Sequence, residues 1–245
     1  MENTNYNCDI ETGVCSPNTS EQTAIEIQEK ENHQKLKITY YYDALCGWCY
    51  GFTDAFKEFK EAHKEDIDFE VVSGGLFLGA RVGKINDVAP YIKQGAYKSV
   101  EQTTGVLFGK PFLDKVLGEG NILLDSLPPA IALSVIKEHH PEKSVEFAEL
   151  LLLAGFKEGI DLTNFKEYEP YVAKIGFDVA LFNTLVTQEA AKNAALKDFA
   201  SFAEKQLGGM PTLLIEHKNK KGVLSNGYTN YNELEKRLEY FINQQ

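Results

Sequence analysis

The residues most able to carry chemistry are two cysteines three positions apart, Cys46 and Cys49, in the segment Leu45-Cys46-Gly47-Trp48-Cys49. The chain has four cysteines in all. Four are too few for a disulfide scaffold, so a close pair indicates redox chemistry or metal binding. In disulfide exchange, a thiolate attacks a substrate sulfur and a second thiol then releases the mixed disulfide. We therefore expect Cys46 to attack and Cys49 to resolve.

The flanking sequence predicts where these two thiols lie. Residues 36–43 are β-branched and aromatic and have the length of one buried strand. From residue 50 to residue 63, apolar side chains recur at helical spacing. A cysteine between a strand and a helix lies at the helix N-terminus, where unpaired N–H groups and the helix dipole favour a thiolate. Cys46 has this position, and Cys49 lies one turn further along the helix.

A second signal is the segment Gly209-Met210-Pro211-Thr212, directly before a predicted strand. A cis Met210–Pro211 bond would leave the Met210 backbone free to pair with an extended substrate beside Cys46. Only ~5% of X-Pro bonds are cis, so this proline alone indicates a strand start. Together with the upstream cysteine pair it predicts a substrate-binding loop, with Pro211 in the catalytic site and Met210 as a substrate contact. Trp48 either contacts substrate or packs against neighbouring helices, and we expect it to be partly exposed.

The remaining elements follow from the apolar pattern. A second strand is predicted at 67–73, helices without a comparable strand signal at about 85–182, and a further helix at 189–207. A hairpin with strands at 212–217 and 223–225 and a turn at 219–222 precedes a last helix at 232–242.

This order predicts an α/β, thioredoxin-like fold with a large helical insertion domain, in which the first two strands are parallel. The thioredoxin-like domain would comprise residues 35–84 and 183–245, and the insertion domain residues 85–182. Residues 1–34 are polar, with almost no large apolar side chains, and are expected to form a flexible N-terminal arm.

Composition narrows the class of protein further. The formal net charge of -11 argues against general affinity for nucleic acid. No run of ~18 apolar residues indicates a membrane span. The N-terminal segment lacks the apolar core of ~7 to 15 residues that a secretory signal needs. We therefore expect a cytoplasmic protein without membrane contact, and the sequence leaves the oligomeric state open.

Three segments together resemble the DsbA family: residues 43–52, Gly74-Gly75-Leu76 and Gly209-Met210-Pro211-Thr212. The nearest branch is its leaderless predicted disulfide isomerases, which include the FrnE-like proteins. The resemblance spans about residues 36–242. It implies an exposed Cys46, a buried Cys49, a cis-proline loop at Met210-Pro211 and exchange of protein disulfides. It implies no cofactor beyond a redox-active Cys46–Cys49 disulfide, with glutathione as a candidate co-substrate.

The sequence departs from the periplasmic oxidant of that family at two places. That oxidant has a histidine between its cysteines, which helps to stabilise the thiolate, whereas this chain has Gly47-Trp48. We therefore expect a redox couple less oxidising than the value of about -120 mV for DsbA, in the range of about -180 to -270 mV. The oxidant also carries a buried acid where this chain has Tyr40. Asp43 is the nearest carboxylate, and either aids proton transfer from Cys49 or caps the helix.

Two alternatives remain open. Cys8 and Cys15 form a second close pair, which either relays electrons to Cys46 and Cys49, binds a soft metal with them in a stress-response protein, or consists of unpaired surface thiols. We expect no metal at the Cys46 site, because no second Cys-x-x-Cys is present. Glutathione-dependent isomerases and transferases share a thioredoxin core with helical insertions, but they do not need a second cysteine such as Cys49.

Overall fold

The computed structural model describes residues 6–8, 15–17 and 35–244. The first two segments form strands β1 (Tyr6–Cys8) and β2 (Cys15–Pro17), which pair antiparallel with Cys8 opposite Cys15. The rest of the predicted N-terminal arm lies outside the described residues, and so do the side chains of these two strands.

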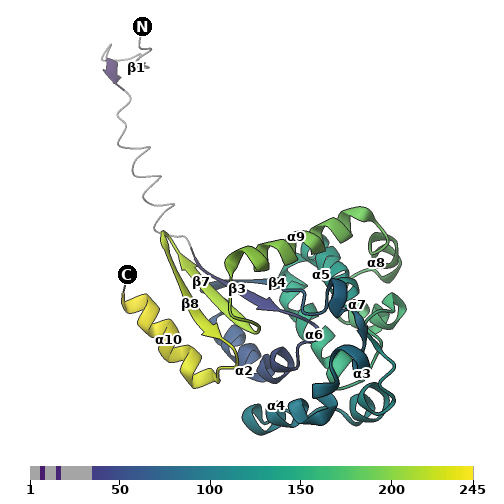
Figure 1. Ribbon diagram of the computed structural model, residues 1–245. Helices are drawn as coiled ribbons and strands as arrows, with labels where there is room; N and C mark the ends of the chain where they lie inside the picture. Colours follow the sequence, from purple (N-terminus) through teal and green to yellow (C-terminus); the bar gives the residue numbers. More distant parts are fainter. Residues whose placement is uncertain (1–5, 9–14, 18–34, 245) are drawn as a thin grey trace.

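A four-stranded mixed sheet in the order β4-β3-β7-β8 forms the centre of the fold (Figure 1). Strand β3 is parallel to β4 and antiparallel to β7, and β7 and β8 form a hairpin. The parallel pairing of β3 and β4, the two strands predicted at 36–43 and 67–73, is confirmed. The bounds are β3 (Leu36–Tyr42), β4 (Ile67–Ser73), β7 (Thr212–His217) and β8 (Lys220–Asn226).

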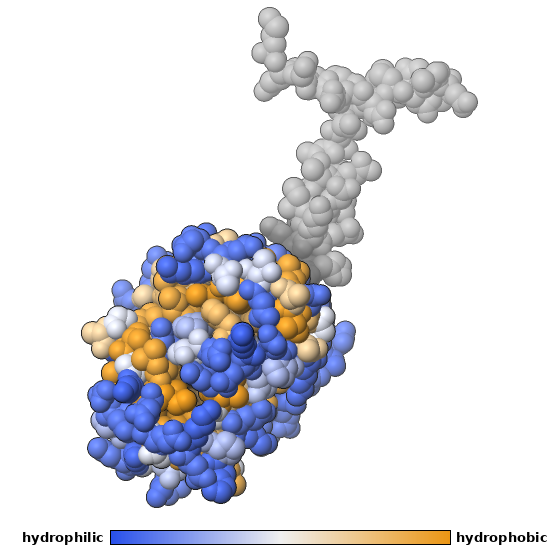
Figure 2. Space-filling view, turned by 90° about the vertical axis from the view of Figure 1, so that its right-hand side faces the viewer, coloured by the Kyte–Doolittle hydropathy of each residue, from blue (hydrophilic) through white to orange (hydrophobic). Residues whose placement is uncertain are grey.

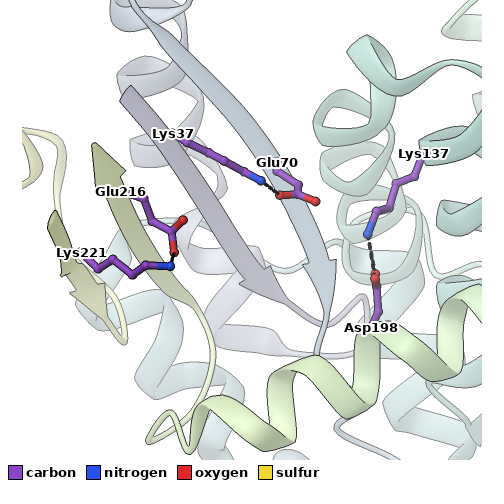
Figure 3. A network of polar contacts seen from close by, with 6 residues as sticks. All are labelled: Lys37, Glu70, Lys137, Asp198, Glu216 and Lys221. Carbon is purple, nitrogen blue, oxygen red and sulfur yellow. Dashed lines mark hydrogen bonds and ion pairs between the residues drawn. The ribbon is translucent and has the colours of Figure 1, made fainter. Parts of the chain in front are cut away.

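The hairpin turn is shorter than predicted. It consists of Lys218 and Asn219, because Lys220 and Lys221 already pair with His217 and Glu216 across the ladder. The ammonium group of Lys221 lies 2.8 Å from a Glu216 carboxylate oxygen (Figure 3). Opposite charges that face each other across two strands stabilise the pairing. Lys220 and Lys221 therefore belong to β8 and not to the turn.

Alternate residues of β3 face two different helix layers. Helix α2 (Gly47–His63) packs on the Tyr40 side, where the Tyr40 ring contacts that of Phe56 with centroids 4.5 Å apart. Helix α10 (Tyr231–Asn243) contacts α2. On the other face, Tyr41 meets Phe202 of helix α9 (Glu189–Lys205), with centroids 5.8 Å apart. The period-two alternation of a strand thus places successive tyrosines in two separate layers.

The chain between β4 and α9 is a helical insertion that packs beside the β4 edge of the sheet (Figure 1). The four strands with α2, α9 and α10 form the predicted thioredoxin-like fold, interrupted by this insertion. Its helices are α3 (Ile85–Val88), α4 (Tyr97–Thr104), α5 (Leu127–His139), α6 (Ser144–Phe156), α7 (Glu169–Lys174) and α8 (Val179–Leu185). Short 3-10 segments lie at Gly79–Arg81, Pro141–Lys143 and Phe165–Tyr168, and π-helical segments at Ile92–Ala96 and Phe112–Glu119.

One detail of the insertion differs from the prediction. Strands β5 (Gly83–Lys84) and β6 (Leu123–Leu124) pair antiparallel, and β6 lies within the segment predicted to be helical throughout. A strand of two residues is too short to produce an alternating pattern, so the sequence contains no signal for it.

The insertion and the sheet share one hydrophobic core, and the predicted domain boundaries therefore stay predictions. Helix α6 is buried on almost every side and contacts both α2 and β4, while α5 packs along α9. The Lys137 ammonium of α5 lies 2.8 Å from both carboxylate oxygens of Asp198 on α9 (Figure 3). No helix in the described part of the chain is long and apolar enough to cross a membrane.

Candidate active site

Cys46 is the N-cap residue of α2 and has extended backbone angles, with φ -91° and ψ 109°. Its Sγ accepts a hydrogen bond from the backbone N–H of Cys49 at 3.3 Å. The N–H of Cys46 itself donates to the Asp43 carbonyl at 3.0 Å, which closes the turn between β3 and α2. A sulfur at this place receives both an N–H donor and the positive end of the helix dipole, and both favour a thiolate.

The insertion lies directly on the first turns of this helix. A methyl group on Gly51 would lie 2.7 Å from Cγ1 of Val100, a residue of α4, so only glycine allows this approach. At Gly47 the corresponding distance to the Phe108 ring is 3.5 Å. The hydroxyl of Tyr50 donates to the Leu107 carbonyl at 2.9 Å. The methyl group at Gly47 would thus be at ordinary contact distance, and it is Gly51 that lets the insertion form one side of the site.

Cys46 is less exposed than the family resemblance implies. Its residue exposure is 6%, against 0% for Cys49, so both thiols are buried and Cys46 is the more accessible. The cause is a contact across the chain: the Cys46 Sγ donates to the backbone carbonyl of Met210 at 3.6 Å. The expectation of an exposed first cysteine is corrected to a thiol that is covered by the Met210 loop on one side.

Burial raises the pKa of the Cys49 thiol well above its ordinary value, and the neighbouring Cys46 sulfur raises it further. Burial likewise raises the pKa of the Tyr40 hydroxyl well above its usual range, with Cys49 and Cys46 as the next causes. Both groups hold their protons at neutral pH. Tyr40, at the position where the periplasmic oxidant has an acid, therefore supplies no base for Cys49.

Asp43 is also buried, with 2% exposure, and backbone donors occupy both of its carboxylate oxygens. Leu45 N–H donates to Oδ1 at 2.9 Å, and Leu76 N–H donates to Oδ2 at 2.8 Å. Burial is the main reason that the pKa of this carboxyl is raised. This arrangement supports a structural role for Asp43, because it ties the loop before Cys46 to the loop after β4.

The Met210–Pro211 peptide bond is cis. Two hydrogen bonds hold the loop: Gly227 N–H donates to the Pro211 carbonyl at 2.7 Å, and the Thr212 hydroxyl donates to the Gly209 carbonyl at 2.8 Å. The first joins the loop to the end of β8. The structure brings Met210, the residue before Pro211, next to Cys46, which lies 164 positions earlier in the chain.

A groove of about 400 Å³ runs along this loop. Trp48 lies on its border and is 39% exposed, which confirms the predicted partial exposure. None of the lining residues carries a charge. They are Trp48, Thr103, Gly208, Gly209, Met210, Asn226, Gly227 and Tyr228.

The residues that the sequence did not identify are Thr103 and the segment Asn226 to Tyr228. They reach the groove from α4 and from the end of β8. No motif marks them, since they gather only when these distant segments pack together. Gly74 and Gly75 belong to a segment that resembles the DsbA family, but the sequence assigns neither of them a role in the site.

A model of the DSBA-like thioredoxin domain family matches residues 37–239. The chain belongs to this family. The match includes Cys46, Cys49, Met210 and Pro211, and it covers the sheet, the insertion and most of α10. The DSBA-like family is one of thiol–disulfide oxidoreductases, so the predicted family is confirmed.

Solved structures with the DSBA-like fold agree with this membership. A candidate protein disulfide isomerase from Nitrosomonas europaea superposes with a TM-score of 0.74 at 20% identity, covering 86% of this chain and 100% of that one. The cytosolic disulfide reductase DsbM from Pseudomonas aeruginosa, also solved with glutathione, gives 0.68 at 21% identity, covering 85% and 100%. A 2-hydroxychromene-2-carboxylate isomerase gives 0.59 at 13% identity, covering 85% and 97%. At these identities the similarities show the fold. No curated protein sequence matches the chain.

The described residues contain no group of three or more His, Cys, Asp or Glu side chains that could hold a metal ion. The side chains of Cys8 and Cys15 lie outside the described residues. A thiolate site that includes them therefore remains an alternative without geometric support from the rest of the chain.

Proposed function

We propose that this protein is a cytoplasmic thiol–disulfide oxidoreductase that exchanges and isomerises protein disulfides. The observation that carries the proposal is the position of Cys46 Sγ, which accepts the Cys49 N–H at the start of α2 and lies beside the Met210 carbonyl. The cytoplasmic location is supported by the likeness in fold to DsbM, which is described as cytosolic.

In the proposed reaction the Cys46 thiolate attacks one sulfur of a substrate disulfide. The substrate S–S bond breaks, a mixed disulfide with Cys46 forms, and the second substrate sulfur leaves as a thiolate that takes up a proton. Cys49 then loses its proton and attacks the Cys46 sulfur, which releases the first substrate sulfur. Two electrons pass from the protein to the substrate. In isomerisation, the released substrate thiolate instead attacks another disulfide of the substrate, and the thiolate freed by that attack breaks the mixed disulfide and releases Cys46. No net electrons pass, and Cys49 stays a thiol.

The surface around the site supports an extended protein segment as substrate. The groove beside Cys46 has no charged lining residue, whereas glutathione carries two carboxylates that a binding site usually matches with cations. Leu107, next to the start of α2, is 70% exposed, and Figure 2 shows hydrophobic side chains gathered at the insertion end of the molecule. Exposed apolar surface of this kind favours contact with other protein chains. As the reductant of the Cys46–Cys49 disulfide we propose glutathione, which needs only to attack one sulfur and not to occupy the groove; the likeness in fold to DsbM, also solved with glutathione, supports this.

The intact cysteine pair favours this proposal over a glutathione-dependent isomerase or transferase. Such an enzyme would not need a second thiol, yet this chain has one at Cys49, within the same turn of helix as Cys46.

The test uses Trp48, the only tryptophan of the chain. Because Trp48 lies between the two cysteines, its fluorescence should report their redox state. We would titrate a variant with Cys8 and Cys15 replaced by serine against glutathione redox buffers. We expect a reversible two-electron transition at about -180 to -270 mV. A transition above the isomerase value would refute the predicted range, and no transition would refute the oxidoreductase.

A second dithiol at Cys8 and Cys15 is proposed separately, because their backbones are cross-strand partners in β1 and β2. Mass spectrometry of alkylated protein after mild oxidation should find a Cys8–Cys15 disulfide. Metal analysis of protein purified without chelator tests the alternative: one tightly held zinc or copper per chain would favour a thiolate site.

A further inference from the structure

Gly74, the residue after β4, leaves room for the side chain of Met210. A methyl group on Gly74 would lie 2.1 Å from Sδ and 2.9 Å from Cε of Met210, far inside contact distance. The backbone of Gly74 is not left-handed, so space and not conformation calls for glycine here. Its N–H donates to the Tyr42 carbonyl at 2.7 Å, which holds it in place. Because Gly74 has no side chain, a gap is left there, and the Met210 thioether fills it.

The space at Gly74 affects where the Met210 side chain lies relative to the groove. Met210 lines the groove beside Cys46, but Gly74 does not. The Met210 thioether lies against the space that a Gly74 side chain would occupy, and the Phe202 ring borders the same space. The main chain of the loop is held by the Gly227 and Thr212 hydrogen bonds, and a methionine side chain turns easily about its own bonds. A side chain on Gly74 would thus displace the thioether and leave the backbone where it is.

We propose that Gly74 is a positioning residue for substrate binding, which acts by keeping the Met210 thioether out of the groove. The inference rests on the proposed function, because the groove is there assigned to the substrate. In a Gly74→Ala variant the thioether turns towards the groove that Met210 already lines and takes space from the substrate segment next to Cys46. The dithiol itself is untouched.

The experiment compares kcat and KM for reduction of a disulfide-linked peptide. Gly74→Ala should raise KM about tenfold, the size expected when one side chain intrudes on a binding pocket, and leave kcat nearly unchanged. The Trp48 redox transition in glutathione buffer should keep its midpoint. In a Met210→Ala background, which has no thioether to displace, Gly74→Ala should change KM little. The control is Gly118→Ala, because Gly118 is exposed and a methyl group there would lie 3.4 Å from its nearest neighbour.

An unchanged KM in Gly74→Ala, or an equal rise in the Met210→Ala background, would overturn the inference. If Gly74→Ala does not fold, Met210→Phe replaces it, because a rigid ring is too wide for the gap and must lie in the groove. The same rise in KM is then expected, and an unchanged KM overturns the inference. A wild-type protein without any redox transition would instead refute the proposed function, so the two failures are distinguishable.

Discussion

The carboxylate of Asp43 accepts a hydrogen bond from the backbone N–H of Leu76 at 2.8 Å, across a separation of 33 residues. Its other oxygen accepts the Leu45 N–H, one residue before Cys46. A single buried side chain therefore joins the loop before Cys46, the proposed attacking thiol, to the Gly74-Gly75 loop beside the Met210 side chain. The relative position of these two loops therefore depends on the hydrogen bonds of Asp43.

Replacing Asp43 by asparagine should destabilise the protein by about 1 to 3 kcal/mol, the cost of leaving a buried backbone donor without an acceptor. Asparagine can accept only one of the two N–H groups, and its amide would face the other with a second donor. Urea unfolding at neutral pH measures the change. The control Asp68→Asn, at an exposed position on β4, should stay within about 0.5 kcal/mol. Equal stability of the two variants would contradict a structural role for Asp43.

The same carboxyl should make stability depend on pH. In the unfolded chain its pKa is about 3.9, whereas burial raises the pKa of Asp43 in the folded protein. The folded state therefore binds the proton more readily. The stabilisation that comes from proton binding at Asp43 is fully present below about pH 4 and is lost as the pH rises through the folded pKa, whereas the two N–H contacts to its oxygens remain. The difference in unfolding free energy between wild type and Asp43→Asn, measured against pH, should follow this sign, and a flat difference would refute it.

The two cysteines should fail in different ways when replaced. Cys46→Ser removes the attacking sulfur and should abolish turnover. Cys49→Ser keeps the attack but lacks the second thiol, so mixed disulfides with substrate should accumulate. Mass spectrometry of the protein after incubation with a disulfide-linked peptide detects the adduct. Full activity of the Cys46 variant would show that the nucleophile is assigned wrongly.

Resolution of the mixed disulfide should be slow at neutral pH and accelerate with alkali. Burial, the largest cause of the raised pKa of Cys49, persists in the mixed disulfide, so the reacting thiolate is scarce. Its fraction grows about tenfold for each pH unit below that pKa. Rapid-quench measurement of the decay of a Cys46–peptide disulfide tests this. A decay rate independent of pH would indicate that a nearby base takes the Cys49 proton.

Two ion pairs drawn in Figure 3, Lys137–Asp198 and Lys37–Glu70, should differ in how much they stabilise the folded protein. Lys137 and Asp198 are mostly buried, and Asp198 also accepts the Ser73 N–H at 3.1 Å. Lys37 and Glu70 are about half exposed. Lys137→Met should cost about 2 kcal/mol because it leaves a partly buried carboxylate unpaired, and Lys37→Met less than about 1 kcal/mol. Thermal unfolding compares them, and equal losses would contradict the difference in burial.

The sequence by itself determined the elements whose causes are local. The aromatic and β-branched segments predicted β3, β4 and β7 within one residue, and the apolar periodicity predicted the helix after Cys46 and the helices of the insertion. The Cys-x-x-Cys spacing at a strand–helix junction predicted the reactive pair. Each of these signals lies within a few turns of chain, where the physical preferences of neighbouring residues decide the structure.

Only the tertiary structure decided how the site is closed. The Met210 carbonyl covers Cys46 from 164 positions away, and the Met210 thioether fills the gap at Gly74 from 136 positions away. The sequence allows Asp43 either to aid proton transfer from Cys49 or to cap the helix, and the structure adds the hydrogen bond from Leu76 to its second oxygen. Such contacts join residues with no periodic relation in the sequence. Their identity depends on which surfaces meet when the sheet, the insertion and the loop pack together, and no local pattern encodes that.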